Sequence, residues 1–165
     1  MSLDLYVESN TPVQHRSTGV FIRENGETRE LTKEEVKEKY GKDVEENVYS
    51  DNTLLHINLT HNLTKMANQC GYKDDVNPKT GRDITLYTLL WHPEEILNKD
   101  SLITKEYLFR LIDLCDSLEL NPDFYKEYNP ENGWGSYEQL LSAVKKLITV
   151  IAPNLNKHLT LKVCA

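Results

Sequence analysis

The stretch that most constrains the fold is Leu55–Gly71, LHINLTHNLTKMANQCG, because its hydrophobic period changes within a few residues. Apolar residues first alternate with polar ones, which predicts a half-buried strand over Thr53–Leu59. From Leu63 they recur at i, i+3, i+4 and i+7, which predicts a helix that starts after the N-cap Thr60 and ends at Gly71. The strand therefore runs directly into a helix, and polar side chains gather where it does so.

Segments on either side of this junction add further strands and helices. Leu3–Glu8 and His158–Cys164 both alternate, so we expect them to pair as neighbouring strands, with the second at a sheet edge. The sequence therefore indicates an α+β fold: a small, mainly antiparallel sheet of three to five strands, with helices packed on one face and an arm of a β-hairpin and a short helix. The other expected elements are a loop over Ser9–Arg16, a mobile loop over Lys73–Thr85, a short helical turn from Pro93, and helices after the N-caps Thr104 and Ser136 that end before Pro122 and at Pro153.

The arm is expected within Val13–Ser50, inserted in a single domain that covers residues 1–165. An Asn25-Gly26 pair between extended segments predicts a hairpin, and a capping box at residues 32–35 predicts a helix of about two turns. Nine carboxylates lie between residues 24 and 46, against six Lys and Arg between residues 23 and 42. Two interpretations stay open: a solvated arm, or a flap that binds a partner or a second copy of the chain.

Composition excludes several classes of protein. The net charge of −7 and the pI of about 5.2 argue against a protein that coats nucleic acid or an anionic membrane. No apolar run approaches the roughly 20 residues of a bilayer-spanning helix, and the first residues lack the pattern of a signal peptide. Three cysteines without a CxxC pair fit a reducing compartment. We therefore expect a cytoplasmic protein without membrane or nucleic-acid partners, and a homo-oligomer stays open.

Polar residues of the junction form the first candidate site. Asn58 lies near the end of the strand, His61 and Asn62 lie at the start of the helix, and Lys65 follows on its polar stripe. Free backbone N–H groups and the positive end of a helix dipole attract anions at such a point. A phosphate, a carboxylate or a ribose hydroxyl would fit there. The alternative is that these side chains only bind the local backbone.

The segment WHPEE, which contains Trp91, His92, Glu94 and Glu95, is the second candidate. Paired carboxylates beside an aromatic ring could carry out acid–base chemistry or hold sugar hydroxyls. More often, such acids form the first turn of a helix, where they complement its dipole.

The loop NPENGWGSY, which contains Asn132, Trp134 and Tyr137, is the third candidate site. Glycines on both sides of the tryptophan let the backbone bend sharply and hold the ring in a fixed position. The loop could therefore supply a platform on which a base or ring stacks. Equally, Trp134 could fill the core from a tight loop.

A basic C-terminal segment contrasts with the acidic chain. Residues 141–165 contain Lys145, Lys146, Lys157 and Lys162 and no carboxylate. This contrast predicts either an anion-binding face or a surface that balances the acidic arm.

No cofactor and no metal are expected. The chain has no Gly-rich phosphate loop and no GxSxG nucleophile motif. His56, His61 and His92 are not spaced like the ligands of a zinc site.

The motifs SLDLY, NxTHNLxKMA, LWxPEE and NPxNGWGxYE occur in this order at residues 2–6, 58–67, 90–95 and 129–138. Together they resemble the motifs of a family of small uncharacterised proteins of bacteriophages and bacteria. His92 stands where the family motif usually has Arg, which would weaken an anion contact there or make it depend on pH. Val13–Ser50 and Lys73–Thr85 resemble insertions relative to shorter members. The resemblance implies a phage context rather than an activity.

The leading hypothesis is non-catalytic binding of a small anionic, nucleotide-like ligand at the junction. His61 and Asn62 would take a phosphate or ribose, and Trp91 or Trp134 would stack a ring. In a phage, such a protein could sequester a bacterial defence signal in the host cytoplasm. One alternative is a small hydrolase or transferase that uses His61 and a WHPEE carboxylate as acid–base pair. Another is an interaction module that acts through the acidic arm.

Overall fold

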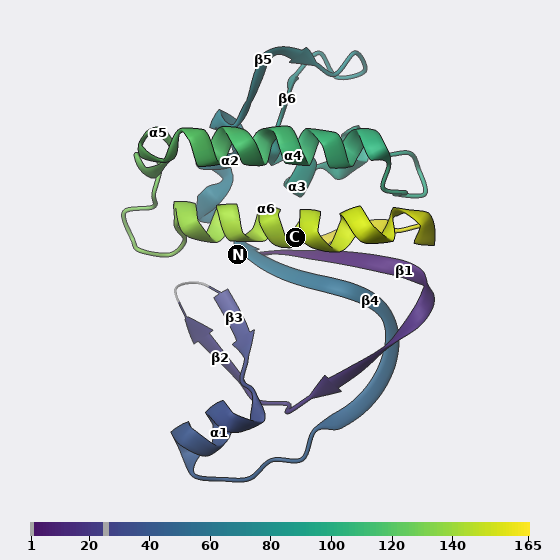
Figure 1. Ribbon diagram of the computed structural model, residues 1–165. Coiled ribbons are helices and arrows are strands. Elements are labelled where there is room, and N and C mark those ends of the chain that lie inside the picture. Colours follow the sequence, from purple (N-terminus) through teal and green to yellow (C-terminus); the bar gives the residue numbers. More distant parts are fainter. Residues whose placement is uncertain (1, 25–26) are drawn as a thin grey trace.

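An antiparallel sheet forms the centre of the protein (Figure 1), with its strands in the order β4 (Asn47–Thr60), β1 (Ser2–Ser17) and β7 (Thr160–Cys164). The computed structural model describes residues 2–24 and 27–165. Side chains of β1 alternate between the two faces of the sheet, and the apolar ones near its start are buried. The expected α+β fold, with a small antiparallel sheet and the first and last strands paired, is confirmed.

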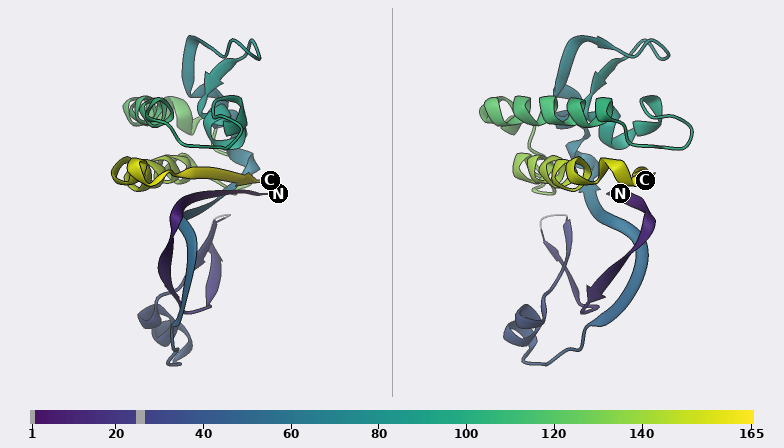
Figure 2. Two further views of the ribbon diagram at one scale, coloured as in Figure 1. Left: turned by 90° about the vertical axis from the view of Figure 1, so that its right-hand side faces the viewer. Right: turned by 45° about the vertical axis from the view of Figure 1, so that its right-hand side comes forward.

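Two long helices lie side by side next to the sheet, as Figures 1 and 2 show. α6 (Tyr137–Asn154) lies against β4, and α4 (Lys105–Leu120) packs on α6. Both begin at the expected N-caps, Thr104 and Ser136, whose hydroxyls accept backbone N–H groups. Pro153 lies inside the last turn of α6, so the expected end at Pro153 is wrong by one residue, because a proline near a C-terminus removes a single hydrogen bond.

The core joins these helices to the sheet. Side chains with no exposed surface come from the sheet, the junction and every long helix: Leu3, Val7, Leu63, Met66, Leu89, Tyr107, Leu111, Leu140, Leu147 and Ile151.

Within residues 2–24 and 27–165, none of the helices has the length and apolar character that a bilayer-spanning segment needs.

β1 and β4 continue together beyond β7 as a two-stranded ribbon. Val13 pairs with Asp51 and Ser17 with Asn47, so the expected loop over Ser9–Arg16 is wrong for its second half, residues 13–16. Pro12 falls where the register of β1 against β4 is irregular, and there it need not donate to the ladder. A ribbon with both faces in water requires no apolar alternation, which is why the pattern predicted a loop.

The arm at the end of this ribbon contains the expected hairpin and helix. β2 (Phe21–Glu24) pairs with β3 (Glu27–Glu30), and α1 (Lys33–Tyr40) follows. The capping box of α1 is present, and Gly41 ends the helix with a φ of 66°. The Asn25-Gly26 turn lies outside the described residues.

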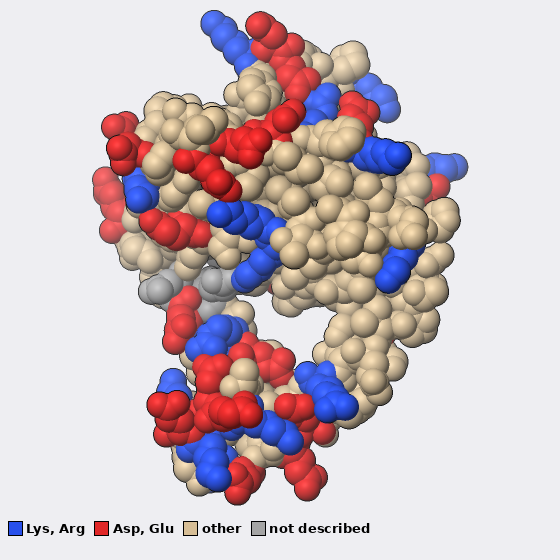
Figure 3. Space-filling model, viewed as in Figure 1, with Lys and Arg blue, Asp and Glu red and all other residues tan. Residues whose placement is uncertain are grey.

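The arm returns toward the helices at its hairpin end. The guanidinium of Arg23 in β2 lies 5.6 Å from the centre of the Trp134 ring, a cation–π contact. Figure 3 shows an opening between the arm and the helical part, and it shows charged side chains of both signs over the arm. The arm is therefore attached through the β1–β4 ribbon and touches the rest of the protein near Trp134.

A second hairpin replaces the expected loop over Lys73–Thr85. β5 (Gly71–Val76) pairs irregularly with β6 (Asp83–Thr85), so the sequence shows no regular alternation there. We expected Gly71 to end the helix, but α2 ends at Gln69 and Gly71 begins β5. A Cβ at Gly71 would lie 2.9 Å from Thr85 Cγ2 and 3.0 Å from the carbonyl oxygen of Ile84, so the close approach of the two strands explains the glycine.

We predict that the arm can be removed without unfolding the rest. Because Ser17 and Asn47 are direct partners in the ribbon, an Asn-Gly turn can replace residues 18–46 and close a two-residue hairpin. The shortened chain should keep cooperative thermal unfolding and the helical circular-dichroism signal of α4 and α6. Loss of cooperative unfolding would show instead that the arm belongs to the core.

Candidate functional site

The junction after β4 is a 3₁₀ turn followed by a short helix, not the continuous helix that the sequence predicts. Thr60 caps it as expected, since its Oγ1 accepts the backbone N–H of Asn62 at 3.3 Å. η1 (His61–Leu63) then leads into α2 (Thr64–Gln69) of only six residues. Because the helix dipole grows with the number of aligned peptide units, this helix attracts an anion weakly. A ligand at the junction must therefore be held by side chains.

A hydrogen bond between two side chains joins the junction to the core. The indole N–H of Trp91, the last residue of α3 (Leu86–Trp91), donates to Nδ1 of His61 at 3.2 Å. Trp91 is buried, with 6% of its surface exposed. Because Nδ1 accepts this bond, a neutral His61 carries its proton on Nε2. Nε2 is buried and has no acceptor within the described residues. Such an unsatisfied donor costs about 1–3 kcal/mol, which an acceptor atom would recover.

The tryptophan loop, residues 129–136, also reaches the junction. The side-chain amide of Asn62 donates to the carbonyl oxygen of Trp134 at 3.2 Å. Asn132 shapes the loop by accepting the Trp134 N–H at 2.9 Å. Gly135, with a φ of 108°, lies directly against Thr60. Both tryptophan segments therefore meet the His61 junction, which the sequence alone left open.

A cleft of about 530 Å³ opens between the junction and the chain that follows α5 (Pro122–Lys126); we call it the His61 cleft. Lys65 is the one lysine of its lining, and Glu127 and Glu131 lie among the residues of the other side. Sequence reasoning missed Glu127 and Tyr128, which lie just before the NPENGWG motif. The described lining residues are His61, Asn62, Thr64, Lys65, Glu127, Tyr128, Asn129, Pro130 and Glu131.

The WHPEE segment contributes to a different cleft, of about 400 Å³, which we call the Tyr87 cleft. His92 and Glu95 line it, and Glu94 hydrogen-bonds to His92 with 3.0 Å between Oε1 and Nδ1. Glu95 pairs with Arg82 at 3.1 Å. Within the described residues, neither carboxylate is therefore bonded to His61. The lining residues are Asn68, Arg82, Asp83, Thr85, Tyr87, Thr88, His92 and Glu95.

Asn58 and Tyr137 lie away from both clefts. Asn58 donates to Asp4 Oδ1 at 2.8 Å, on the face of the sheet opposite the buried side chains of β1. Burial raises the pKa of the Asp4 carboxyl, but hydrogen bonds from Asn58 and His56 outweigh it and hold the pKa below its ordinary value. Tyr137 is 5% exposed, and its hydroxyl donates to the carbonyl of Leu118 at 2.6 Å. Both side chains support the fold around the site.

The Trp134 ring is 47% exposed. Arg23 of the arm lies over the ring, and the backbone carbonyl of Trp134 accepts a hydrogen bond from the side-chain amide of Asn62. The ring therefore lies beside the His61 cleft without lining it.

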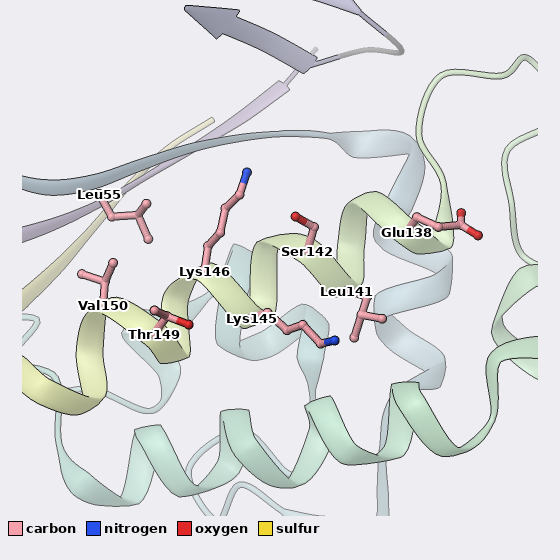
Figure 4. Close-up of a pocket in the computed structure, with 8 residues that line it drawn as sticks. All are labelled: Leu55, Glu138, Leu141, Ser142, Lys145, Lys146, Thr149 and Val150. Atoms are coloured by element: carbon pink, nitrogen blue, oxygen red, sulfur yellow. The ribbon is translucent and has the colours of Figure 1, made fainter.

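Two of the four C-terminal lysines line a groove of about 420 Å³ along α6, and their side chains point in different directions (Figure 4). Lys145 and Lys146 project from α6 beside an apolar floor that includes Leu55 of β4. Lys145 pairs with Glu119 of α4 at 3.2 Å. Lys162 lies on β7 and lines another depression, so the basic residues of the sequence do not form one face.

Comparisons of the chain with protein-family models, with curated proteins and with solved structures found no match. The resemblance carried by the four motifs stays a prediction. Among residues 2–24 and 27–165, no three His, Cys, Asp or Glu side chains come together as metal ligands.

We predict that Gly135→Ala destabilises the protein more than Gly133→Ala. Both glycines have positive φ, so an alanine at either costs about 1–2 kcal/mol in backbone strain. A Cβ at Gly135 would also lie 2.7 Å from Thr60 Cγ2 and 3.2 Å from Leu63, which adds about 1–3 kcal/mol, whereas Gly133 faces open space. Urea denaturation of the two variants measures the difference. Equal losses would show that the tryptophan loop does not press on the junction.

Proposed function

We propose that the protein binds a small anionic, nucleotide-like molecule in the His61 cleft without catalysing a reaction. The observation that carries this proposal is the buried Nε2–H of His61, a donor without an acceptor beside a cleft of ligand size. Lys65 and the amide of Asn62 lie on the same side of the cleft. A phosphate or carboxylate oxygen in the cleft would meet the lysine charge, and a small shift of the side chains that cover Nε2 would let it accept the imidazole N–H as well.

The partners of His61 argue against a role as general base. A base needs a free lone pair, but that of Nδ1 accepts the Trp91 indole N–H and Nε2 already carries the proton. Glu94 and Glu95, the carboxylates that would complete an acid–base pair, are bonded to His92 and Arg82. The hydrolase or transferase with His61 at its centre is therefore the weaker hypothesis.

The acidic side of the cleft favours a nucleotide-like molecule over a simple anion. Glu127 and Glu131 would repel a bare phosphate, but they can accept hydrogen bonds from ribose hydroxyls or from the amino group of a base. Tyr128 places an aromatic ring in the same lining, on which a base can stack. A ligand with an anionic end and a hydroxyl-bearing or amino-bearing end suits both sides.

The family resemblance adds a context to this chemistry. In a phage protein, a site of this kind would sequester a nucleotide-derived signal of bacterial defence in the host cytoplasm. Sequestration requires tight binding and no turnover, which agrees with a His61 that has no free lone pair.

We predict that nucleotides raise the melting temperature of the full chain and that Lys65→Met weakens this effect. A ligand at 100 times its Kd adds about 2.7 kcal/mol to the free energy of unfolding. A thermal-shift screen of linear and cyclic nucleotides measures it. Lys65 is exposed, so its substitution should not disturb folding, and Lys99→Met provides a control of equal charge change at an exposed loop.

Two results would contradict the proposal. One is that no nucleotide shifts the melting temperature of the full chain. The other is that Lys65→Met and Asn62→Ala respond to nucleotides as strongly as the Lys99 control does.

The exposed apolar side chains of the arm support a second candidate, an interaction module. Phe21, Tyr40, Val48 and Tyr49, on the arm and its ribbon, are 48 to 58% exposed. Large exposed apolar side chains are one feature of surfaces that bind other proteins. The chain shortened at residues 18–46 separates the two candidates, because it removes Phe21 and Tyr40, two of these four side chains, and leaves the residues of the His61 cleft in place.

A further inference from the structure

We infer that Tyr87, His92 and Glu94 form a second, reactive site, in which His92 activates the Tyr87 hydroxyl for acyl transfer from a small polar carbonyl ester. The Tyr87 hydroxyl lies 3.0 Å from Nε2 of His92, and Nδ1 of His92 lies 3.0 Å from Oε1 of Glu94. A hydroxyl, an imidazole and a carboxylate are thus joined in one hydrogen-bonded line. This is the arrangement that activates a nucleophile through a base that a third group orients.

The protonation of His92 follows from its partners. A carboxylate only accepts, so Nδ1 of His92 donates to Glu94. Nε2 of the neutral ring then has a free lone pair and accepts from the Tyr87 hydroxyl. The Glu94 carboxylate also stabilises the imidazolium that forms when His92 takes the proton. His61 is held in the opposite way, with its Nδ1 lone pair occupied by Trp91, so the two histidines differ in chemistry.

Aromatic packing holds Tyr87 in place. Its ring stacks on the buried Trp91, with 5.6 Å between the ring centres and 23° between the planes. The His92 ring meets it edge-on, at 5.1 Å and 67°. Because Trp91 is fixed in the core, the Tyr87 hydroxyl keeps its position at the cleft without a cost in side-chain ordering when a substrate arrives.

The lining of the Tyr87 cleft selects the class of substrate. One cation, Arg82, lies among two carboxylates, Asp83 and Glu95. A phosphate dianion would be repelled there, whereas an uncharged carbonyl ester would not. Thr85, Thr88 and Asn68 supply hydroxyl and amide groups that can bind its polar atoms.

The transfer step needs no reactant besides the protein and the ester, because each bond that forms is matched by one that breaks. The Tyr87 oxygen attacks the carbonyl carbon, and its proton passes to Nε2 of His92. The bond between the carbonyl carbon and the leaving oxygen then breaks, and the proton passes from His92 to that oxygen. The products are an acyl ester of Tyr87 and an alcohol, and water can later hydrolyse the acyl ester.

Acetylation by p-nitrophenyl acetate tests the inference. Release of p-nitrophenolate gives the rate, and mass spectrometry of peptides identifies the acetylated tyrosines of the full chain. Tyr40, Tyr49 and Tyr72 are exposed by 52, 48 and 53% and serve as internal controls. Tyr49 is the closest match, because it stacks on His15 at 5.2 Å and no hydroxyl-to-imidazole bond joins the two within the described residues.

We expect Tyr87 to be acetylated on the order of 10²-fold faster than Tyr49, which is the usual effect of general base catalysis. Tyr87→Phe should abolish the fast phase and keep the ring stacked on Trp91. His92→Ala should lower the Tyr87 rate to that of Tyr49, and added imidazole should restore it. Glu94, which acts through His92, is a positioning residue: Glu94→Ala should slow the reaction, and Glu94→Gln, which still accepts from Nδ1, should recover much of the rate.

The wild-type protein alone can overturn the inference, whatever the stability of the variants. A Tyr87 rate less than about tenfold above that of Tyr49 excludes activation by a neighbouring base. A fast Tyr87 rate that His92→Ala leaves unchanged excludes His92 as the base. Both outcomes leave nucleotide binding at the His61 cleft unaffected, because that site uses other side chains.

Discussion

The hydrogen bond from the Trp91 indole to His61 is the interaction on which the candidate sites depend. A buried indole N–H needs an acceptor, and His61, the first residue after β4, supplies it at 3.2 Å. The same bond fixes the ring of His61 at the edge of one cleft and leaves its proton on Nε2. Tyr87, which lines the Tyr87 cleft, stacks on Trp91, so Trp91 supports this second cleft as well.

Local signals explain what the sequence predicted correctly. The strand before the junction, the Thr60 cap, the capping boxes and the first and last strands each depend on residues within a few positions of one another. The contacts that build the site do not. Trp91 and His61 are 30 residues apart, and Asn62 and Trp134 are 72 apart, so their meeting depends on how α3 and the tryptophan loop pack on the junction.

The errors have separate physical causes. Residues 13–17 of β1 lie in a ribbon with both faces in water, and the β5–β6 hairpin pairs irregularly and its strands bury only Ile84, so no alternation of apolar residues marks either segment. The alternative hypothesis paired His61 with Glu94 or Glu95, but Glu94 bonds to His92, two residues away in the chain, and Glu95 pairs with Arg82. The cleft residues Glu127 and Tyr128 follow α5, and sequence spacing alone could not place them opposite the junction.

His61 has a structural role at Nδ1 and, in the proposed function, a binding role at Nε2 of the same ring, and this limits what its substitution can show. An apolar residue there would leave the Trp91 N–H without its acceptor, so the fold around both clefts would lose free energy even if no ligand existed. A loss of ligand binding in such a variant would therefore not identify the site. Asn62 and Lys65 are exposed and lie on the same side of the cleft, and neither accepts the indole N–H. Their side chains can be changed while the bond that holds the junction stays intact, so they separate binding from folding where His61 cannot.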